Sequence, residues 1–151
     1  MASAGERIAE QLRVALSGRD VDGLATLATP GVVGHDVSEA TPRHGRDGVR
    51  QALARYLDAF PDLQIVNDGA VIADDAVALN WVARGTHRGA FLNIPPTGRT
   101  VEVQGVALLA VEGGRVAQWS LVWDVAGLLR GLGLLPELAA DRPVGEATRG
   151  R

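Results

Sequence analysis

Residues 63–125 read LQIVNDGAVIADDAVALNWVARGTHRGAFLNIPPTGRTVEVQGVALLAVEGGRVAQWSLVWDV and predict four successive β-strands. The expected strands are LQIVNDGAVIA at 63–73, AVALNWVARGTH at 76–87, RTVEVQGVALLAVE at 99–112 and RVAQWSLVWDV at 115–125. Turn formers separate them in the form of Asp-Asp, Pro-Pro-Thr-Gly and Gly-Gly. Strands joined by such turns pair antiparallel, so we expect a meander.

Helices are predicted before these strands. Ser3 and Glu6 have the spacing of a capping box, and apolar residues then recur at helical spacing, which predicts an amphipathic helix over 4–17. A second amphipathic helix is predicted over 46–60, where Pro61 ends it. Helices first and strands later favour an α+β fold, in which a curved antiparallel sheet wraps around the N-terminal helices.

The region between these two helices is less regular. Asp20 is expected to cap a short helix through GLATLA (23–28), which Pro30 and Gly31 end. The next segment, VVGHDVSEATPRHG (32–45), has turn formers and no clear period. We therefore expect it to lie over the surface or over the mouth of a pocket.

The length of the chain suits one domain. Its 151 residues can bury a sizeable core without disulfides. We expect the domain to occupy residues 1–140, closed by an amphipathic turn GLLRGLGLLP at 127–136, with a polar tail at 141–151.

Composition excludes several kinds of chemistry. The chain has no Cys, and all 15 basic residues are Arg, which removes thiolate nucleophiles, Schiff bases on lysine and the phosphate-loop lysine. The three histidines have neither HxH nor HExxH spacing, and no GxGxxG follows a strand, so neither a metal nor a cofactor is expected.

Charge and hydropathy limit the partners. A net charge of −3 provides no basic patch for nucleic acid, and no apolar run approaches the length of a membrane span. Glu6 and Arg7 interrupt the N-terminus where a signal peptide would be apolar. We expect a cytoplasmic protein that binds neither nucleic acid nor membrane.

Asp124 and His35 are the candidate acid–base residues. Asp124 lies between Trp123 and Val125, where desolvation would let its carboxyl group act near neutral pH, although an Asp before VAGLLRGLG is equally suited to N-capping a helix. His35 precedes Asp36 in the irregular segment and is expected either to shuttle protons at a pocket entrance or to lie in a surface turn.

The run GTHRGAFLNIPPTG (85–98), the Gly-Gly hairpin and the Asp before Gly-Leu-Leu resemble the SnoaL-like polyketide cyclase family. The first half is similar more loosely, through His-Asp at 35–36 and GRDGVR at 45–50, so the resemblance covers most of residues 5–136. It implies a cone-shaped fold like that of nuclear transport factor two, with helices plugging a bent sheet. It also implies ring closure of polyketides by aldol condensation, and a homodimer paired through the outer sheet face.

This chain differs from the family at two catalytic positions. The aspartate that serves as acid and base in the aldol cyclases falls on Leu121, and a histidine of the preceding strand falls on Ala107. Neither replacement can transfer a proton. The Asp-Arg-Asp group of limonene-type epoxide hydrolases is also unmatched, since Leu79, Trp81 and Ala83 occupy that strand.

With Leu121 at the family's acid position, strand alternation assigns a cavity face. This face carries Val101, Val103, Gly105, Ala107, Leu109, Trp119, Leu121 and Trp123. The tryptophans are expected either to stack on a substrate or to fill the core. Four further strand residues are candidates to contact the substrate if they face inward: Asn80, Trp81, His87 and Gln104. Asn80, Trp81 and Gln104 are equally compatible with the opposite face of the sheet. The alternative for His87 is a structural role at a tight strand end.

These observations favour a cofactor-independent cyclase or isomerase that closes rings in a hydrophobic polyketide or related natural product. Two alternatives are an epoxide-opening hydrolase or cyclase, and a module that binds a small ligand or dimerises without catalysis. The expected partner in each case is a hydrophobic small molecule, and a homodimer is expected.

Overall fold

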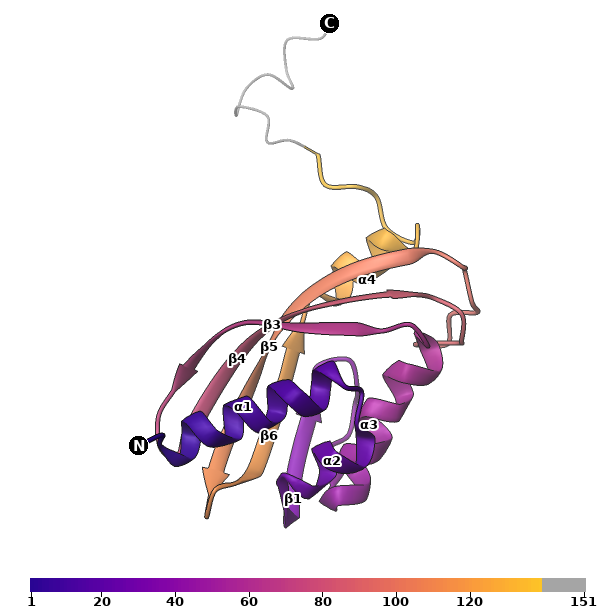
Figure 1. Cartoon of the computed structure of the whole chain (residues 1–151). Helices are drawn as coiled ribbons and strands as arrows, with labels where there is room; N and C mark the ends of the chain where they lie inside the picture. The colour runs from indigo at the N-terminus through magenta and orange to yellow at the C-terminus, as the bar shows by residue number, and fades with distance from the viewer. Residues whose placement is uncertain (140–151) are drawn as a thin grey trace, which may run out of the picture.

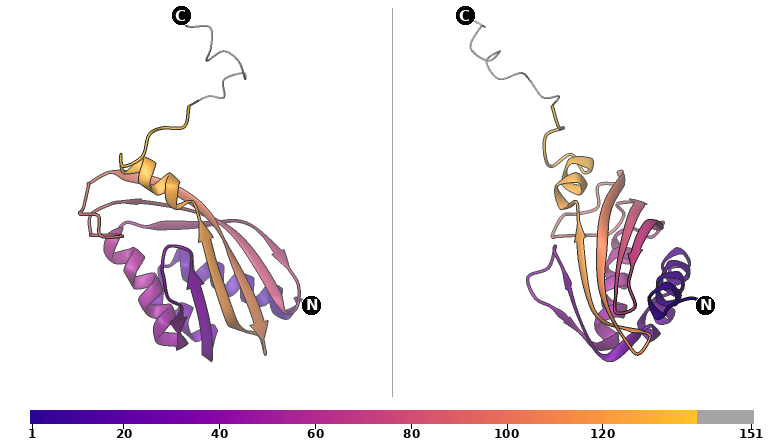
Figure 2. Two further views of the ribbon diagram at one scale, coloured as in Figure 1. Left: turned by 180° about the vertical axis from the view of Figure 1, so that it is seen from behind. Right: turned by 90° about the vertical axis from the view of Figure 1, so that its left-hand side faces the viewer.

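A computed structural model describes residues 1–139 and consists of one bent sheet with helices packed in its curve (Figure 1). The helices are α1 (Ala4–Ser17), α2 (Val21–Thr26), α3 (Gly45–Ala59) and α4 (Val125–Gly131). Figure 2 shows the strands bending around α1 and α3, with α4 at one end of the sheet. The α+β class and the curved sheet expected from the sequence are confirmed, whereas the predicted tail at 141–151 lies outside the described residues.

The sheet contains six strands within the described residues. They are β1 (Ala28–Asp36), β2 (Arg43–His44), β3 (Gln64–Ile72), β4 (Ala76–Thr86), β5 (Thr100–Glu112) and β6 (Arg115–Trp123). Their order is β2-β1-β6-β5-β4-β3. The pairs β3–β4, β4–β5 and β5–β6 are antiparallel, as the predicted meander requires. Strand β1, which was not predicted, pairs antiparallel with β2 and parallel with β6. Strand β1 thereby joins the N-terminal half of the chain to the last strand of the meander.

Strand β1 corrects the sequence prediction for residues 28–36. The segment was expected to be irregular after a helix ended by Pro30 and Gly31, but α2 ends at Thr26 and the chain enters the sheet directly. The β1–β6 register shifts between Ala28 and Val33, and this irregularity accommodates Pro30 and Gly31. The pairing partner lies more than 80 residues away in the chain, so local sequence carries little signal for this strand.

Helix α1 follows its sequence signals closely. Ser3 accepts a hydrogen bond from the backbone of Glu6, and the Glu6 side chain accepts one from Ser3, which completes the capping box. Ile8 and Leu12 on one face are buried against the sheet. Asp20 caps α2 in the same way, through the backbone N–H of Gly23.

The core has two apolar clusters along the inner face of the sheet. One gathers around α1, α2 and the first half of β4, and the other around α3, α4 and the loop that carries Phe91. Between residues 1 and 139, no helix has the length and apolar character needed to cross a membrane.

Candidate functional site

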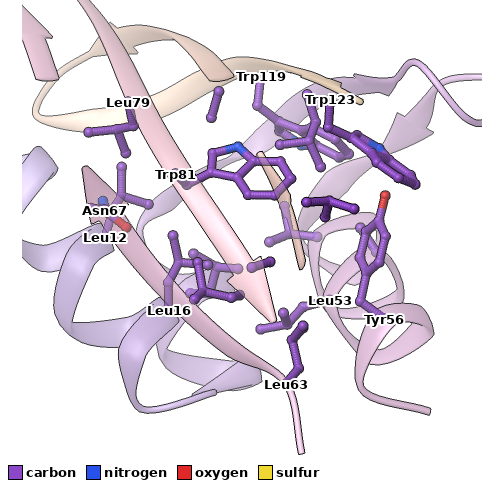
Figure 3. A pocket seen from close by; sticks show the side chains of 18 of the residues that line it. Leu12, Leu16, Leu53, Tyr56, Leu63, Asn67, Leu79, Trp81, Trp119 and Trp123 are labelled. Atoms are coloured by element: carbon purple, nitrogen blue, oxygen red, sulfur yellow. The ribbon is translucent and has the colours of Figure 1, made fainter. Parts of the chain in front are cut away.

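A cavity of about 190 Å³ lies between the concave face of the sheet and the helices (Figure 3). All four helices and every strand except β2 contribute to its walls. The walls include the predicted inner-face residues Val101, Val103, Ala107, Leu109, Trp119, Leu121 and Trp123. Trp81, whose direction the sequence left open, also lines the cavity. An engineered cavity of about 150 Å³ in another protein takes up benzene, so this cavity suits a compact aromatic guest.

Two glycines make room for the indoles that line the cavity. A Cβ atom added to Gly34 on β1 would overlap the ring of Trp119. A Cβ added to Gly105 on β5 would lie 2.5 Å from the ring of Trp81 and 2.6 Å from Cβ of Trp123. Both glycines therefore serve the shape of the cavity by letting aromatic rings pack directly on the backbone.

A buried carboxylate lies behind one wall of the cavity, bonded to two residues of that wall. Asp36 ends β1, and its side chain is only 1% exposed. Its Oδ1 accepts hydrogen bonds from Trp123 Nε1 at 3.1 Å and from the backbone and hydroxyl of Ser38 at 2.8 and 2.6 Å. Its Oδ2 accepts a hydrogen bond from the Tyr56 hydroxyl. A carboxylate so far from water requires this many donors to be retained.

Tyr56 connects this carboxylate to the cavity. Its ring comes from α3 and lines the cavity, and Figure 3 shows its hydroxyl close to the Trp123 indole. Burial disfavours the phenolate, and together with the negative charge of Asp36 it raises the pKa of Tyr56 above its usual range. Tyr56 is therefore a protonated hydroxyl whose hydrogen bond is directed at a carboxylate.

One arginine, Arg55, lies beside the carboxylate. Arg55 Nη1 lies 3.9 Å from Asp36 Oδ2 and donates to Ser38 Oγ at 3.2 Å. Its guanidinium also stacks over the rings of Tyr56 and Phe91, 5.3 and 4.5 Å from their centroids. These contacts partly offset the buried negative charge and fix the two rings that face the cavity.

The structure places the two predicted acid–base residues outside the cavity. Asp124 is the N-cap of α4, where it accepts a hydrogen bond from Gly127 N at 2.8 Å, and its side chain is 42% exposed. The expectation that Asp124 is desolvated is wrong, because Asp124 lies one residue beyond Trp123, the last inward-facing residue of β6. His35 is exposed on the outer face of β1, since alternation directs the next residue, Asp36, inward.

Asn80 and Gln104 also face away from the cavity. Both are exposed on the convex side of the sheet, between inward neighbours such as Trp81 and Val103. His87 is fully buried but does not line the cavity. Its Nδ1 accepts a hydrogen bond from the backbone of Thr97 at 3.1 Å, which ties the two ends of the loop between β4 and β5. These contacts agree with the alternative of a structural role for His87.

Three residues of the site were not among the sequence candidates: Tyr56 and Asn67, which line the cavity, and Asp36, which lies behind its wall. The His-Asp pair at 35–36 signalled Asp36, but the absence of a predicted strand there concealed which of the two faces inward. Tyr56 lies within the amphipathic helix predicted over 46–60, and no other role was predicted for it. Among the described residues, no three His, Asp or Glu side chains gather as a metal site would need.

Comparisons with known proteins agree with this geometry. IdmH from Streptomyces antibioticus, a candidate polyketide cyclase, shares 30% identity over 84% of this chain and 96% of its own, with a TM-score of 0.71. AclR from Streptomyces galilaeus, a candidate hydroxylase, shares 28% identity over 88% of this chain and 87% of its own, with a TM-score of 0.75.

A third solved structure supports the fold alone. It is a candidate SnoaL-like cyclase from Jannaschia sp. CCS1, with 23% identity over 88% of this chain and 94% of its own and a TM-score of 0.78. No curated protein matches the chain. The model of the SnoaL-like polyketide cyclase family matches residues 6–132. The chain therefore belongs to the SnoaL-like polyketide cyclase family.

Proposed function

We propose that the protein is a cofactor-independent cyclase or isomerase that uses Tyr56 and Asp36 to move a proton on a hydrophobic polyketide or related ketone. The observation that carries the proposal is the hydrogen bond from Tyr56, a cavity residue, to the buried carboxylate of Asp36. Most of the cavity wall is aliphatic or aromatic, so this pair is its strongest source of acid–base chemistry.

The pair can act as a two-step proton relay. A ketone whose α-carbon rests against the Tyr56 hydroxyl would lose a proton to the Tyr56 oxygen, while Tyr56 passes its own proton to Asp36 Oδ2. The enolate carbon then attacks a second carbonyl of the same molecule, and the new alkoxide takes a proton back from Tyr56. Asp36 returns its proton to Tyr56, so the protein ends in its initial state.

The cavity contributes by positioning the substrate. Holding two carbons of one chain in contact can lower a barrier by roughly 7–11 kcal/mol. The rings of Tyr56, Phe91 and Trp123 pack on one another with centroids 5.5–6.2 Å apart, which gives a rigid wall for a flat substrate. An apolar interior also keeps water from protonating the enolate.

Deuterium exchange tests the relay without knowledge of the natural substrate. The probe is 2-tetralone in D₂O, a compact bicyclic ketone whose α-protons exchange through an enolate, followed by proton NMR. We expect the protein to accelerate exchange, and Tyr56→Phe and Asp36→Asn each to reduce that acceleration by about 10²-fold or more. Asp124→Asn and His35→Gln are matched controls that alter exposed groups outside the cavity and should exchange at the rate of the unmodified protein.

Three results would contradict the relay. Equal acceleration by Tyr56→Phe and by the unmodified protein would exclude the tyrosine. Loss of exchange in Asp124→Asn would assign the acid–base role to Asp124, at the start of α4. Binding of 2-tetralone without any exchange would favour a ligand-binding module.

The similarity to AclR supports a second candidate, a hydroxylation that inserts one oxygen atom of O₂ into a C–H bond and reduces the other to water with two electrons from an external reductant. The two reactions differ in mass balance, since ring closure by aldol addition leaves the mass unchanged and hydroxylation adds one oxygen atom. Mass spectrometry of the product from any turned-over substrate separates them.

We also propose that two copies pair through the convex face of the sheet. Val71, Leu108 and Val122 stand on this face with 77%, 50% and 51% of their surface exposed. Apolar side chains grouped in this way on a sheet commonly mark an interface.

A further inference from the structure

Two polar atoms in the cavity wall have no hydrogen-bond partner. They are Oδ1 of Asn67 on β3, an acceptor, and Nε1 of Trp81 on β4, a donor. Both are buried, both residues line the cavity, and the two are directly opposite each other in the antiparallel register. Figure 3 shows Asn67 on the side of the cavity away from Tyr56, with the Trp81 ring between the two.

The backbone directs Asn67 inward. It follows Ile65 in the alternation of β3, and the β3–β4 register shifts immediately after it, near Gly69, whose φ is +119°. The position therefore belongs to the apolar inner face, where an aliphatic side chain would leave no polar atom without a hydrogen-bond partner. A buried amide oxygen and a buried indole N–H without partners both destabilise the protein, which is a reason to expect that a bound molecule forms hydrogen bonds with them.

We propose that Asn67 and Trp81 form a recognition site for a phenolic or enolic hydroxyl group of the substrate. Asn67 Oδ1 would accept a hydrogen bond from the hydroxyl group. Trp81 Nε1 would donate a hydrogen bond to the hydroxyl oxygen or to an adjacent carbonyl oxygen of the substrate. Phenols and enolised diketones supply this combination of donor and acceptor on a flat apolar frame. Because both atoms are shielded from water, the neighbouring side chains must shift slightly for the hydroxyl to reach them.

This inference rests on the proposed function, which supplies the Tyr56–Asp36 pair as the second point of contact with the substrate. Strand β4 is three strands from β1, or roughly 14 Å along the sheet and less across the curve. This is the distance between the two backbones, and the Trp81 ring spans part of it, because that ring and Trp123 Cβ both lie against Gly105. The hydroxyl site and the Tyr56–Asp36 pair therefore occupy different parts of one cavity, with Asn67 at the far end from Tyr56. A substrate bound at both would present its reacting carbon at one end and its phenol or enol at the other.

The test compares p-cresol with toluene, which differ by one hydroxyl group. The chain has three tryptophans, so the indole N–H signals in a ¹H–¹⁵N spectrum are few, and Trp81→Phe assigns the signal of Trp81 by its loss. We expect p-cresol to bind about tenfold more tightly than toluene and to move the Trp81 N–H signal downfield. Asn67→Leu should remove that preference and leave the affinity for toluene unchanged.

Asn67→Leu also carries its own control for folding. Because it replaces an unsatisfied amide by an apolar side chain of similar size, its melting temperature should equal or exceed that of the unmodified protein. A lower melting temperature would mean that Asn67 has a structural partner, which would overturn the inference. Equal affinity for the two ligands, an equal loss of both in Asn67→Leu, or no binding of either would overturn it as well.

Tyr56→Phe separates this inference from the proposed function. If the cresol preference survives in Tyr56→Phe, the hydroxyl is read at Asn67 and Trp81, whatever the outcome of the deuterium exchange. If the preference is lost there and kept in Asn67→Leu, the phenol binds at Asp36 and the inference is wrong. Failure of exchange with an intact preference would reject only the proton relay.

Discussion

Asp36 on β1 and Leu121 on β6 are in register across the parallel strand pair, and Leu121 is in turn in register with Ala107 on β5. Position 121, where the resemblance to aldol cyclases implies a carboxyl group, carries Leu, and a buried carboxyl group stands on the adjacent strand. Asp36 also has what a working carboxylate needs, namely donors from Trp123 and Ser38 and a hydroxyl partner that reaches the cavity.

Leu121→Asp would place a second carboxyl group beside the first. Two neighbouring carboxylates in an apolar wall repel each other, and each loses hydration, so we expect a loss of about 3 kcal/mol or more in the free energy of unfolding. One of the pair has to keep its proton to a higher pH than in the unfolded chain. The loss should therefore grow as pH rises from about 4 to about 7.

Urea titrations at several pH values measure this loss. The matched control is the double variant Asp36→Asn, Leu121→Asp, which has one carboxyl group and should regain much of the stability. A Leu121→Asp protein as stable as the double variant at neutral pH would show that the two side chains do not interact.

Alkaline pH reports on Tyr56 alone. The chain has one Tyr, no Cys and no Lys, so no other side chain changes protonation between about pH 9 and pH 12. Burial and Asp36 raise the pKa of Tyr56 in the folded state, whereas the unfolded chain has the ordinary value of about 10. The stabilisation is complete below pH 10 and is lost as pH rises towards the folded-state pKa.

The measurement is the free energy of unfolding between pH 8 and 12, with tyrosinate absorbance at 295 nm as the second signal. Tyr56→Phe should show a flat profile over the same range. Tyrosinate that appears near pH 10 while the protein is still folded would show that Tyr56 is neither buried nor bonded to Asp36.

Gly105→Ala tests how the cavity is shaped. The added methyl group would meet the Trp81 ring and Trp123 Cβ, so we expect a loss of about 1–3 kcal/mol in stability and a displacement of Trp81 that weakens toluene binding. Gly31→Ala is the matched control, because no atom lies within 4 Å of a Cβ at that position. Equal toluene affinity for both variants would mean that Trp81 does not shape the cavity.

Much of the fold was predictable because its signals are local. The capping box of α1, the Asp20 cap and the turns between β3 and β6 depend on residues a few positions apart. Strand β1 was not predictable in this way. Pro30, Gly31 and Gly34 obscure its alternation, and its main partner is β6, which is far away in the chain.

The site was harder to predict because it depends on parity and on distant contacts. Once Trp81 is assigned to the cavity, alternation excludes Asn80, and the inward Val103 excludes Gln104 in the same way. The sequence contains that constraint. It does not contain the meeting of Asp36 with Trp123, because 87 residues separate them and only the β1–β6 pairing brings them together.

Leu108→Glu tests the proposed dimer. Leu108 lies on the convex face of β5, half exposed, where a carboxylate costs little in a monomer but would be buried unpaired between two sheets. We expect sedimentation equilibrium to show a dimer for the unmodified chain and a monomer, or a dimer weakened by at least about 10²-fold, for the variant. Val14→Glu on α1 replaces another exposed apolar side chain away from this face and should leave the dimer intact. A monomer in every case, or a dimer that Leu108→Glu leaves unchanged, would reject the convex face as the interface.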